Sequence, residues 1–217
     1  MVSNAEAGDG DRGVVEIQSP AVQGYLHHPS GQPSGALVLA HGAGSHCRAP
    51  LLVAVAGEMS RLGWWVLRCD LAFRRQRRSG PPRPSDGAAD REGLRLAADF
   101  LRSQWQGPVC LGGHSYGGRQ ASMLAAENPA VARALLLLSY PLHPPNKPGQ
   151  LRTAHWPQLR TPVCFVHGTR DPFGSVEELQ EWTQQIPAPS KLLTIQGAGH
   201  DLKAGREVGF CGQFAAF

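Results

Sequence analysis

The chain has 217 residues, of which 41% are hydrophobic and 18% are charged, and its formal net charge is +4 at pH 7. This composition is typical of a packed domain and excludes a disordered chain. No apolar run approaches the roughly 20 residues that a membrane-spanning helix needs, so we expect no membrane partner. We expect a flexible N-terminus over residues 1–13 and a single domain over residues 14–217.

The cysteines are scattered and include no C-x-x-C pair; they are Cys47, Cys69, Cys110, Cys164 and Cys211. Cys110 and Cys164 lie in apolar runs, where cysteine acts as a small hydrophobic residue. The first ten residues lack the basic and apolar segments of a secretory signal. We therefore expect a reducing, cytoplasmic location.

In chain order, the pattern first predicts a hairpin of two edge strands, over residues 14–17 and 22–26. Continuous apolar runs then indicate buried strands, over residues 36–40, 64–71, 108–112, 134–140, 162–168 and 191–195. Helical segments alternate with them, over residues 50–62, 86–104, 120–129 and 176–186, and a closing helix is expected near the C-terminus. This alternation predicts an α/β fold with a mostly parallel, doubly wound sheet and helices on both faces.

The stretch around Ser115 carries the strongest functional signal. Gly113-x-Ser115-x-Gly117 follows a predicted strand and precedes a predicted helix. In that context the pattern exposes the serine hydroxyl at the apex of a strained turn, and the glycines allow strand and helix to pack closely. Glycine is abundant in this chain, so the pattern alone could also be an idle serine in a glycine-rich turn. The rest of the chain must therefore supply a base and an acid.

Two later residues qualify as that base and acid. A serine hydroxyl becomes a nucleophile when a histidine takes its proton and a carboxylate orients the histidine. Asp171 and His200 each follow a predicted strand, and the order Ser115, Asp171, His200 is that of α/β-hydrolases. No acidic residue occurs from residue 128 to residue 170, and His200 is the only histidine after Asp171. The other candidates for the acid lie on the next helix and are expected to face solvent: Glu177, Glu178 and Glu181.

Negative charge that develops on a substrate oxygen needs fixed N–H donors. Tyr116 begins the helix after Ser115, and Ala43 lies in the loop after the strand 36–40. Their backbone N–H groups are predicted to form an oxyanion hole, with Gly42 leaving room for the substrate. His41 is expected to be a packed, hydrogen-bonded structural residue.

Four segments together resemble the α/β-hydrolase superfamily over nearly the whole chain: His41-Gly42-Ala43-Gly44, Gly113-His114-Ser115-Tyr116-Gly117-Gly118, His167-Gly168-Thr169-Arg170-Asp171 and Gly199-His200-Asp201. More narrowly, the chain resembles the small cap-less hydrolases near dienelactone hydrolase. Within these it is similar to bacterial relatives of a testis-expressed hydrolase-like protein and of a chromatin-complex hydrolase-like subunit. The resemblance implies one α/β-hydrolase domain without a cap. Dienelactone hydrolases carry a cysteine where this chain has Ser115.

Together these residues predict a serine hydrolase that cleaves a small ester, or else a thioester or amide, through a Ser-His-Asp triad and an acyl-enzyme. The alternative is a catalytically weak or inactive interaction module on the same fold. The histidines lack metal-ligand spacing such as H-E-x-x-H, so we expect no metal and no cofactor. The expected partner is a small-molecule ester and not a nucleic acid; both a monomer and a homodimer are compatible with the sequence.

A loop after the strand 64–71 is rich in arginine: Arg74, Arg75, Arg77, Arg78 and Arg83. It lacks the aromatic residues that interleave with basic ones in nucleic-acid binding surfaces. One interpretation is a solvated loop whose charge aids solubility. The other is that Arg74 or Arg75 binds a substrate carboxylate or phosphate, because the planar guanidinium matches such groups bidentately.

The segment after the strand 134–140 is the position at which lidded relatives insert a cap. Here the corresponding segment, residues 141–158, is short and rich in proline and polar residues. The sequence therefore predicts an open site with no helical lid.

Overall fold

The computed structural model describes residues 13–203 and 208–217. Apart from Gly13, the flexible N-terminus predicted for residues 1–13 lies outside the described residues. Within the described residues, eight strands form one sheet in the order β1-β2-β4-β3-β5-β6-β7-β8. Their bounds are β1 Val14–Gln18, β2 Gln23–His27, β3 Gly35–Ala40, β4 Trp64–Cys69, β5 Val109–His114, β6 Leu135–Leu138, β7 Val163–Gly168 and β8 Ser190–Ile195.

The first two strands form the predicted edge hairpin. β1 pairs with β2 antiparallel, and β2 pairs with β4 antiparallel, so the hairpin attaches to one edge of the sheet. The remaining neighbours, from β4 through β8, pair in parallel. The mostly parallel sheet predicted from the apolar runs is therefore confirmed.

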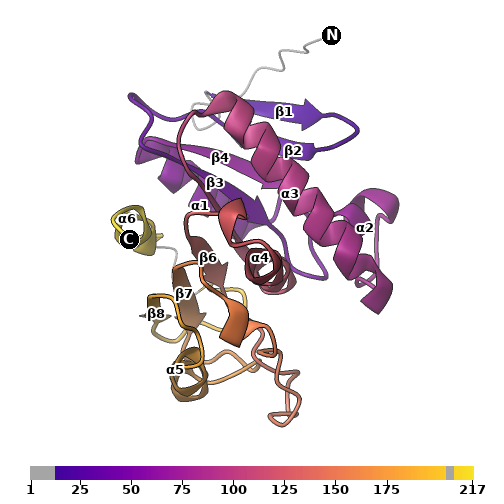
Figure 1. The fold of residues 1–217 in the computed structure, drawn as a ribbon, viewed down its shortest axis with the longest axis vertical. Coiled ribbons are helices and arrows are strands. Elements are labelled where there is room, and N and C mark those ends of the chain that lie inside the picture. The colour runs from indigo at the N-terminus through magenta and orange to yellow at the C-terminus, as the bar shows by residue number, and fades with distance from the viewer. Residues whose placement is uncertain (1–12, 204–207) are drawn as a thin grey trace.

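The continuous apolar runs form strands because helices cover both faces of the sheet. Every residue of β3, β6 and β7 is buried. One face packs against α3 Gly87–Gln104, α4 Tyr116–Glu127 and α5 Val176–Thr183, through Leu94, Leu124 and Leu179 among others. The other face packs against α1 Pro50–Arg61 and α6 Phe210–Ala215, through Leu52 and Phe214. Figure 1 shows α3 crossing in front of the sheet, with α4 seen nearly end-on.

The basic loop after β4 is more ordered than the sequence predicted. It begins with a short helix, α2 Ala72–Gln76, and ends in a 3-10 turn, Pro84–Asp86. Phe73 anchors the helix, because its side chain is 1% exposed and lies in the core beside α3. The arginine-rich sequence has no apolar periodicity, and a single buried residue is not sufficient to predict a helix.

The segment between β6 and β7 contains no α-helix; its one helical turn is a 3-10 turn, Trp156–Gln158. The prediction that no helical cap is inserted here is confirmed. None of the helices in the described ranges has the length and apolar character needed to cross a membrane. All five cysteines are free and buried.

Candidate active site

Ser115 lies in the turn between β5 and α4, with φ 52° and ψ −115°. A positive φ is rare for a residue with a side chain, and it persists only where the surroundings enforce it. The Ser115 N–H donates to the Leu138 carbonyl oxygen on β6 at 2.8 Å, which ties the turn to the sheet. The serine is therefore held in a strained conformation between a strand and a helix, as the motif predicts.

The two glycines of the motif allow β5 and α4 to approach β3. A Cβ on Gly113 would lie 2.5 Å from the Ala40 carbonyl oxygen, and a Cβ on Gly117 would lie 2.5 Å from the His41 carbonyl oxygen. Contacts this short do not occur at a real Cβ, so a larger residue would push the helix away from the sheet. The glycines thus fix the position of Ser115 relative to the loop after β3.

Three side chains from separate loops form one hydrogen-bonded chain. The distance from Ser115 Oγ to His200 Nε2 is 2.8 Å. On the other side of the ring, His200 Nδ1 lies 2.8 Å from Asp171 Oδ2 and 3.0 Å from Asp171 Oδ1. With the proton on Nδ1, the imidazole donates to Asp171 and its Nε2 accepts from the serine hydroxyl. The structure therefore brings together the three residues that the sequence singled out.

Asp171 is held as a buried carboxylate at the end of β7. Its side chain is fully buried, and its Oδ1 accepts a hydrogen bond from the Phe173 N–H at 2.9 Å. Of the alternative acids, Glu178 instead binds the Ser175 N–H as the capping box of α5. Glu177 and Glu181 are exposed on the same helix, and His200 contacts Asp171 instead.

Phe173 and His114 also position His200, although no sequence pattern predicted a role for either residue. The Phe173 ring lies 4.1 Å from the His200 ring, centroid to centroid, at 31°. His114 Nε2 lies 2.7 Å from the His200 carbonyl oxygen, so the ring donates to the backbone of the loop that carries His200. Burial lowers the pKa of His114, which favours the neutral ring. His114 directly precedes Ser115, and that adjacency is the only signal that the sequence offered.

The loop after β3 passes beside the serine. A Cβ on Gly42 would lie 3.0 Å from His114 Nδ1 and 3.6 Å from Ser115 Cβ, so a side chain there would crowd the serine. Arg74 holds this loop from outside: its Nε donates to the Ser45 carbonyl oxygen at 2.8 Å and its Nη2 to the Ala43 carbonyl oxygen at 3.1 Å. The position of Ala43 thus depends on the Arg74 guanidinium.

Tyr116 is anchored through its side chain. Its hydroxyl donates to Asp90 Oδ2 on α3 at 2.7 Å, and Asp90 Oδ1 accepts from the Phe73 N–H at 2.9 Å. Asp90 is fully buried, and burial raises the pKa of its carboxyl. Burial and the hydrogen bond to Asp90 raise the pKa of Tyr116. This network joins α2, α3 and the first turn of α4.

A cleft of 570 Å³ opens at Ser115. Its walls come from the loop before α3, the two helices α3 and α4, and the segment between β6 and β7; the lining residues are Ala43, Pro81, Pro82, Arg83, Pro84, Gly87, Arg91, Ser115, Tyr116, Arg119, Gln120, Met123, Pro141, Arg152 and Phe173. The predicted oxyanion residues Ala43 and Tyr116 therefore border the same cleft as Ser115.

The structure does not bring Arg74 and Arg75 to this cleft. Arg74 is occupied by the Ala43 and Ser45 carbonyl groups. Arg75 donates to the carbonyl oxygens of Ala21 and Pro20, beside the edge hairpin. The geometry thus gives no support to the anion-binding role expected for these two arginines. In the described part of the chain, no three His, Cys, Asp or Glu side chains are grouped as a metal site requires.

A family model for the alpha/beta hydrolase domain matches residues 22–213 of the chain. The chain belongs to the alpha/beta hydrolase family. The fold and the hydrolase class predicted from the motifs are therefore confirmed.

Solved structures of other alpha/beta hydrolases share the fold. An alpha-beta serine hydrolase homologue from Coxiella burnetii is 19% identical, has a TM-score of 0.72 and is matched over 99% of each chain. Dienelactone hydrolase from Anabaena variabilis is 24% identical with a TM-score of 0.68, over 90% of this chain and 88% of that chain. An a/b serine hydrolase without lid from Xanthomonas campestris is 14% identical with a TM-score of 0.68, over 100% of this chain and 96% of that chain.

Proposed function

We propose that this alpha/beta hydrolase cleaves small carboxylic esters, with Ser115 as nucleophile, His200 as general base and Asp171 as the group that orients His200. The observation that carries the proposal is the hydrogen-bonded chain from Ser115 Oγ through His200 to Asp171, at 2.8 Å on each side of the ring. A strained backbone at the serine and a fully buried acid support it further.

The first half of the reaction forms an acyl-enzyme. His200 Nε2 takes the proton from Ser115 Oγ, and Oγ attacks the ester carbonyl carbon. The C=O electron pair moves to the oxygen, which becomes an oxyanion. When the tetrahedral intermediate collapses, the C–O bond to the alcohol breaks and His200 gives its proton to the leaving alkoxide.

The second half releases the acid. A water molecule gives a proton to His200 while its oxygen attacks the acyl carbonyl carbon. When this second tetrahedral intermediate collapses, the bond to Ser115 Oγ breaks and His200 returns the proton to Oγ. Asp171 stabilises the imidazolium that exists between these proton transfers. In both halves we assign the oxyanion to the backbone N–H groups of Ala43 and Tyr116, because donors fixed in advance stabilise the developing charge without reorganisation.

The open cleft favours small substrates. The segment between β6 and β7 contributes Pro141 and Arg152 to the rim and has no helix that would cover the serine. Long acyl chains bind more tightly in an enclosed apolar pocket, since the burial of apolar surface drives their binding. We therefore expect acetyl and butyryl esters to be better substrates than long-chain esters.

The rival function is a non-catalytic interaction module on the same fold. Such a module has no need of a fully buried carboxylate hydrogen-bonded to a histidine beside a strained serine, and holding these groups costs stability. The site geometry therefore favours the enzyme.

The test is a screen of 4-nitrophenyl esters of graded acyl length with wild type, Ser115→Ala, His200→Ala and Ser103→Ala. Ser103 is an exposed serine on α3 and controls for handling of the variants. We expect wild type and Ser103→Ala to turn over short esters, and both site variants to fall by roughly 10³-fold or more in kcat. Turnover that is equal in Ser115→Ala and wild type would rule out Ser115 as the nucleophile.

A further inference from the structure

The cleft at Ser115 is lined by four arginines that come from separate parts of the chain. Arg83 precedes the 3-10 turn, Arg91 lies on α3, Arg119 on α4, and Arg152 on the segment between β6 and β7. None of the described residues that line the cleft is acidic. A cleft whose lining carries charge of one sign attracts an oppositely charged ligand.

Two of the four arginines are excluded as the main binding groups, Arg91 by its contacts and Arg83 by its exposure. Arg91 Nε donates to Glu127 Oε2 at 3.0 Å, and its Nη1 donates to Gln120 Oε1 at 3.2 Å, so its charge is already paired. Arg83 is exposed to solvent. Arg119 and Arg152 are only partly exposed, and they remain as candidates.

Arg119 lies one helical turn after Ser115, and its N–H donates to the Ser115 carbonyl oxygen at 2.9 Å. Helical side chains lean towards the N-terminus, and Arg119 lines the same cleft as Ser115. Its Nε is buried and has no hydrogen-bond partner among the described residues. A buried donor without an acceptor is costly, and a ligand oxygen would remove that cost.

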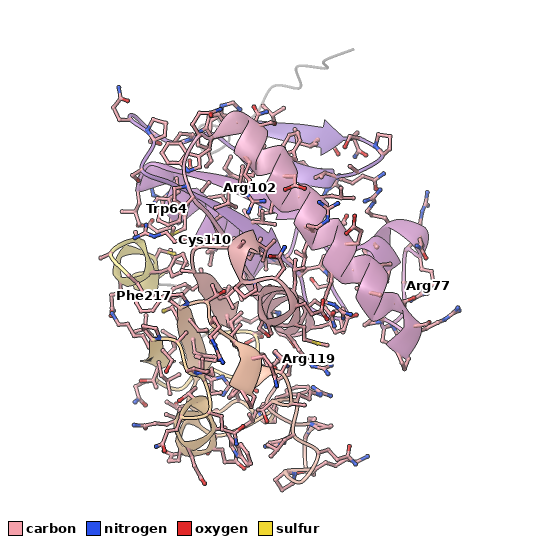
Figure 2. All side chains as sticks on the ribbon, in the orientation of Figure 1. Trp64, Arg77, Arg102, Cys110, Arg119 and Phe217 are labelled. Carbon is pink, nitrogen blue, oxygen red and sulfur yellow. The ribbon has the colours of Figure 1, made fainter. Side chains whose placement is uncertain are left out.

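Arg152 lines the same cleft as Arg119. Burial and the Arg119 charge both lower the pKa of Arg152. Figure 2 shows Arg119 beside the segment that joins β6 to β7, on which Arg152 lies. The neighbouring His155 is also affected: burial and the charges of Arg119 and Arg91 lower its pKa to about 4, so it stays neutral.

We propose that Arg119 and Arg152 bind an anionic group on the substrate, so that the preferred esters of this hydrolase carry a carboxylate or a phosphate away from the scissile bond. Two neighbouring guanidinium groups match the oxygens of such an anion bidentately and lose their mutual repulsion when it binds. This inference rests on the proposed function, because it assigns the substrate class of the same site.

The test compares two esters that differ only in charge: the mono-4-nitrophenyl ester of adipate and the same ester with the free carboxylate methylated. A third ester with a phosphonate in place of the carboxylate separates the two kinds of anion. We expect wild type to prefer the anionic esters over the methylated one in kcat/KM. Arg119→Gln and Arg152→Gln should each lower this preference by roughly tenfold or more, as expected for lost hydrogen bonds to a charged group.

The controls separate local binding from net charge and from folding. Arg160→Gln removes the same charge from an exposed position outside the cleft, and it should leave the preference unchanged. Arg119→Lys keeps the charge but not the planar fork, and it should restore part of the preference. Melting temperatures identify any variant that fails to fold. No anion preference in wild type, or an equal loss in Arg160→Gln and Arg119→Gln, overturns the proposal.

A binding measurement distinguishes failure of the proposed anion site from failure of the proposed hydrolysis. Adipate and inorganic phosphate are titrated calorimetrically into Ser115→Ala and into Ser115→Ala with Arg119→Gln. Binding that is lost with Arg119 supports the anion site even if no ester is hydrolysed, in which case only the proposed reaction fails. Absence of binding together with equal rates for charged and neutral esters overturns the anion site and leaves the proposed reaction intact.

Discussion

At the level of single residues, one arginine outside the cleft supports the loop that borders it. Arg74 donates to four carbonyl oxygens, of Ser45, Ala43, Gly80 and Arg77, at 2.8, 3.1, 3.1 and 3.2 Å. The loop that carries Ala43 has no strand or helix of its own, and the guanidinium supplies fixed partners for its carbonyl groups. Arg74 is thus a positioning residue for one of the two proposed oxyanion donors.

Replacing Arg74 with alanine should therefore lower kcat and change KM little, because the Ala43 N–H acts mainly on the oxyanion of the transition state. We expect a fall of roughly tenfold, smaller than the 10²-fold or more that follows outright loss of an oxyanion donor. Steady-state kinetics with 4-nitrophenyl acetate measure it. Arg78→Ala is the matched control, since Arg78 is exposed. Equal kcat values for Arg74→Ala and Arg78→Ala would contradict the positioning role.

At the scale of elements, the site depends on how closely α4 packs against β3 and β5. Gly117 is the contact point, because a Cβ there would lie 2.5 Å from the His41 carbonyl oxygen and 2.7 Å from the Ala40 carbonyl carbon. Gly57, in the middle of α1, provides the contrast: a Cβ on Gly57 would meet no atom within 4 Å.

Gly117→Ala should lower the free energy of unfolding by about 1–3 kcal/mol, because the added methyl group overpacks the junction of helix and sheet. Gly57→Ala should raise it by roughly 0.5–1 kcal/mol, since alanine loses less backbone entropy in a helix. Urea unfolding of both variants measures the two changes. Opposite signs are the expected outcome; a stabilising Gly117→Ala would mean that α4 does not pack as tightly as described.

At the scale of the whole molecule, buried neutral histidines link stability to pH. Burial lowers the pKa of His27, His41 and His155 to about 4 in each case. His27 Nε2 accepts from Arg68 Nε at 2.8 Å, and His41 Nε2 accepts from the Leu71 N–H at 3.2 Å, so neither ring can take a proton without losing a bond. In the unfolded chain a histidine titrates at about 6.5.

Between pH 6.5 and pH 4 the unfolded chain therefore binds protons that the folded chain does not, and stability falls as the pH is lowered through this range. We expect a loss of at least about 2 kcal/mol between pH 7 and pH 4.5, because each pKa unit on one group contributes ~1.4 kcal/mol. Urea unfolding at graded pH measures the slope, and His155→Gln should make it shallower. Stability that stays constant from pH 7 to pH 4.5 would contradict the buried neutral state.

The local motifs explain why the fold and the Ser115, Asp171 and His200 constellation could be predicted from the sequence. Apolar strand runs and glycine turns are contiguous in the chain, so the elements they form can be predicted without knowledge of distant residues. The order of strand ends then brings the three loops to the same edge of the sheet. These residues were predictable because topology alone places them.

The rest of the site depends on tertiary contacts that no local pattern encodes. Arg119 and Arg152 line the same cleft because the coil between β6 and β7 lies against α4, where Ser122 Oγ is 2.8 Å from His155 Nε2. Phe173 contacts His200 through the path of the turn after β7. The sequence drew attention to the dense run at Arg74 and Arg75, whereas these side chains bind backbone carbonyl groups in the structure. The substrate-binding role of Arg74 and Arg75 therefore stays a prediction to which these contacts give no support.

In the proposed mechanism, Ser115 is the residue that becomes covalently acylated. A fluorophosphonate probe reacts with an activated serine and stops at the first half of the reaction, so its adduct reports the nucleophile directly. Intact-mass spectrometry of wild type and Ser115→Ala, followed by peptide mapping, is the measurement. We predict one adduct per chain on the peptide containing Ser115 and none on Ser115→Ala. Stoichiometric labelling of Ser115→Ala would mean that another residue is the nucleophile.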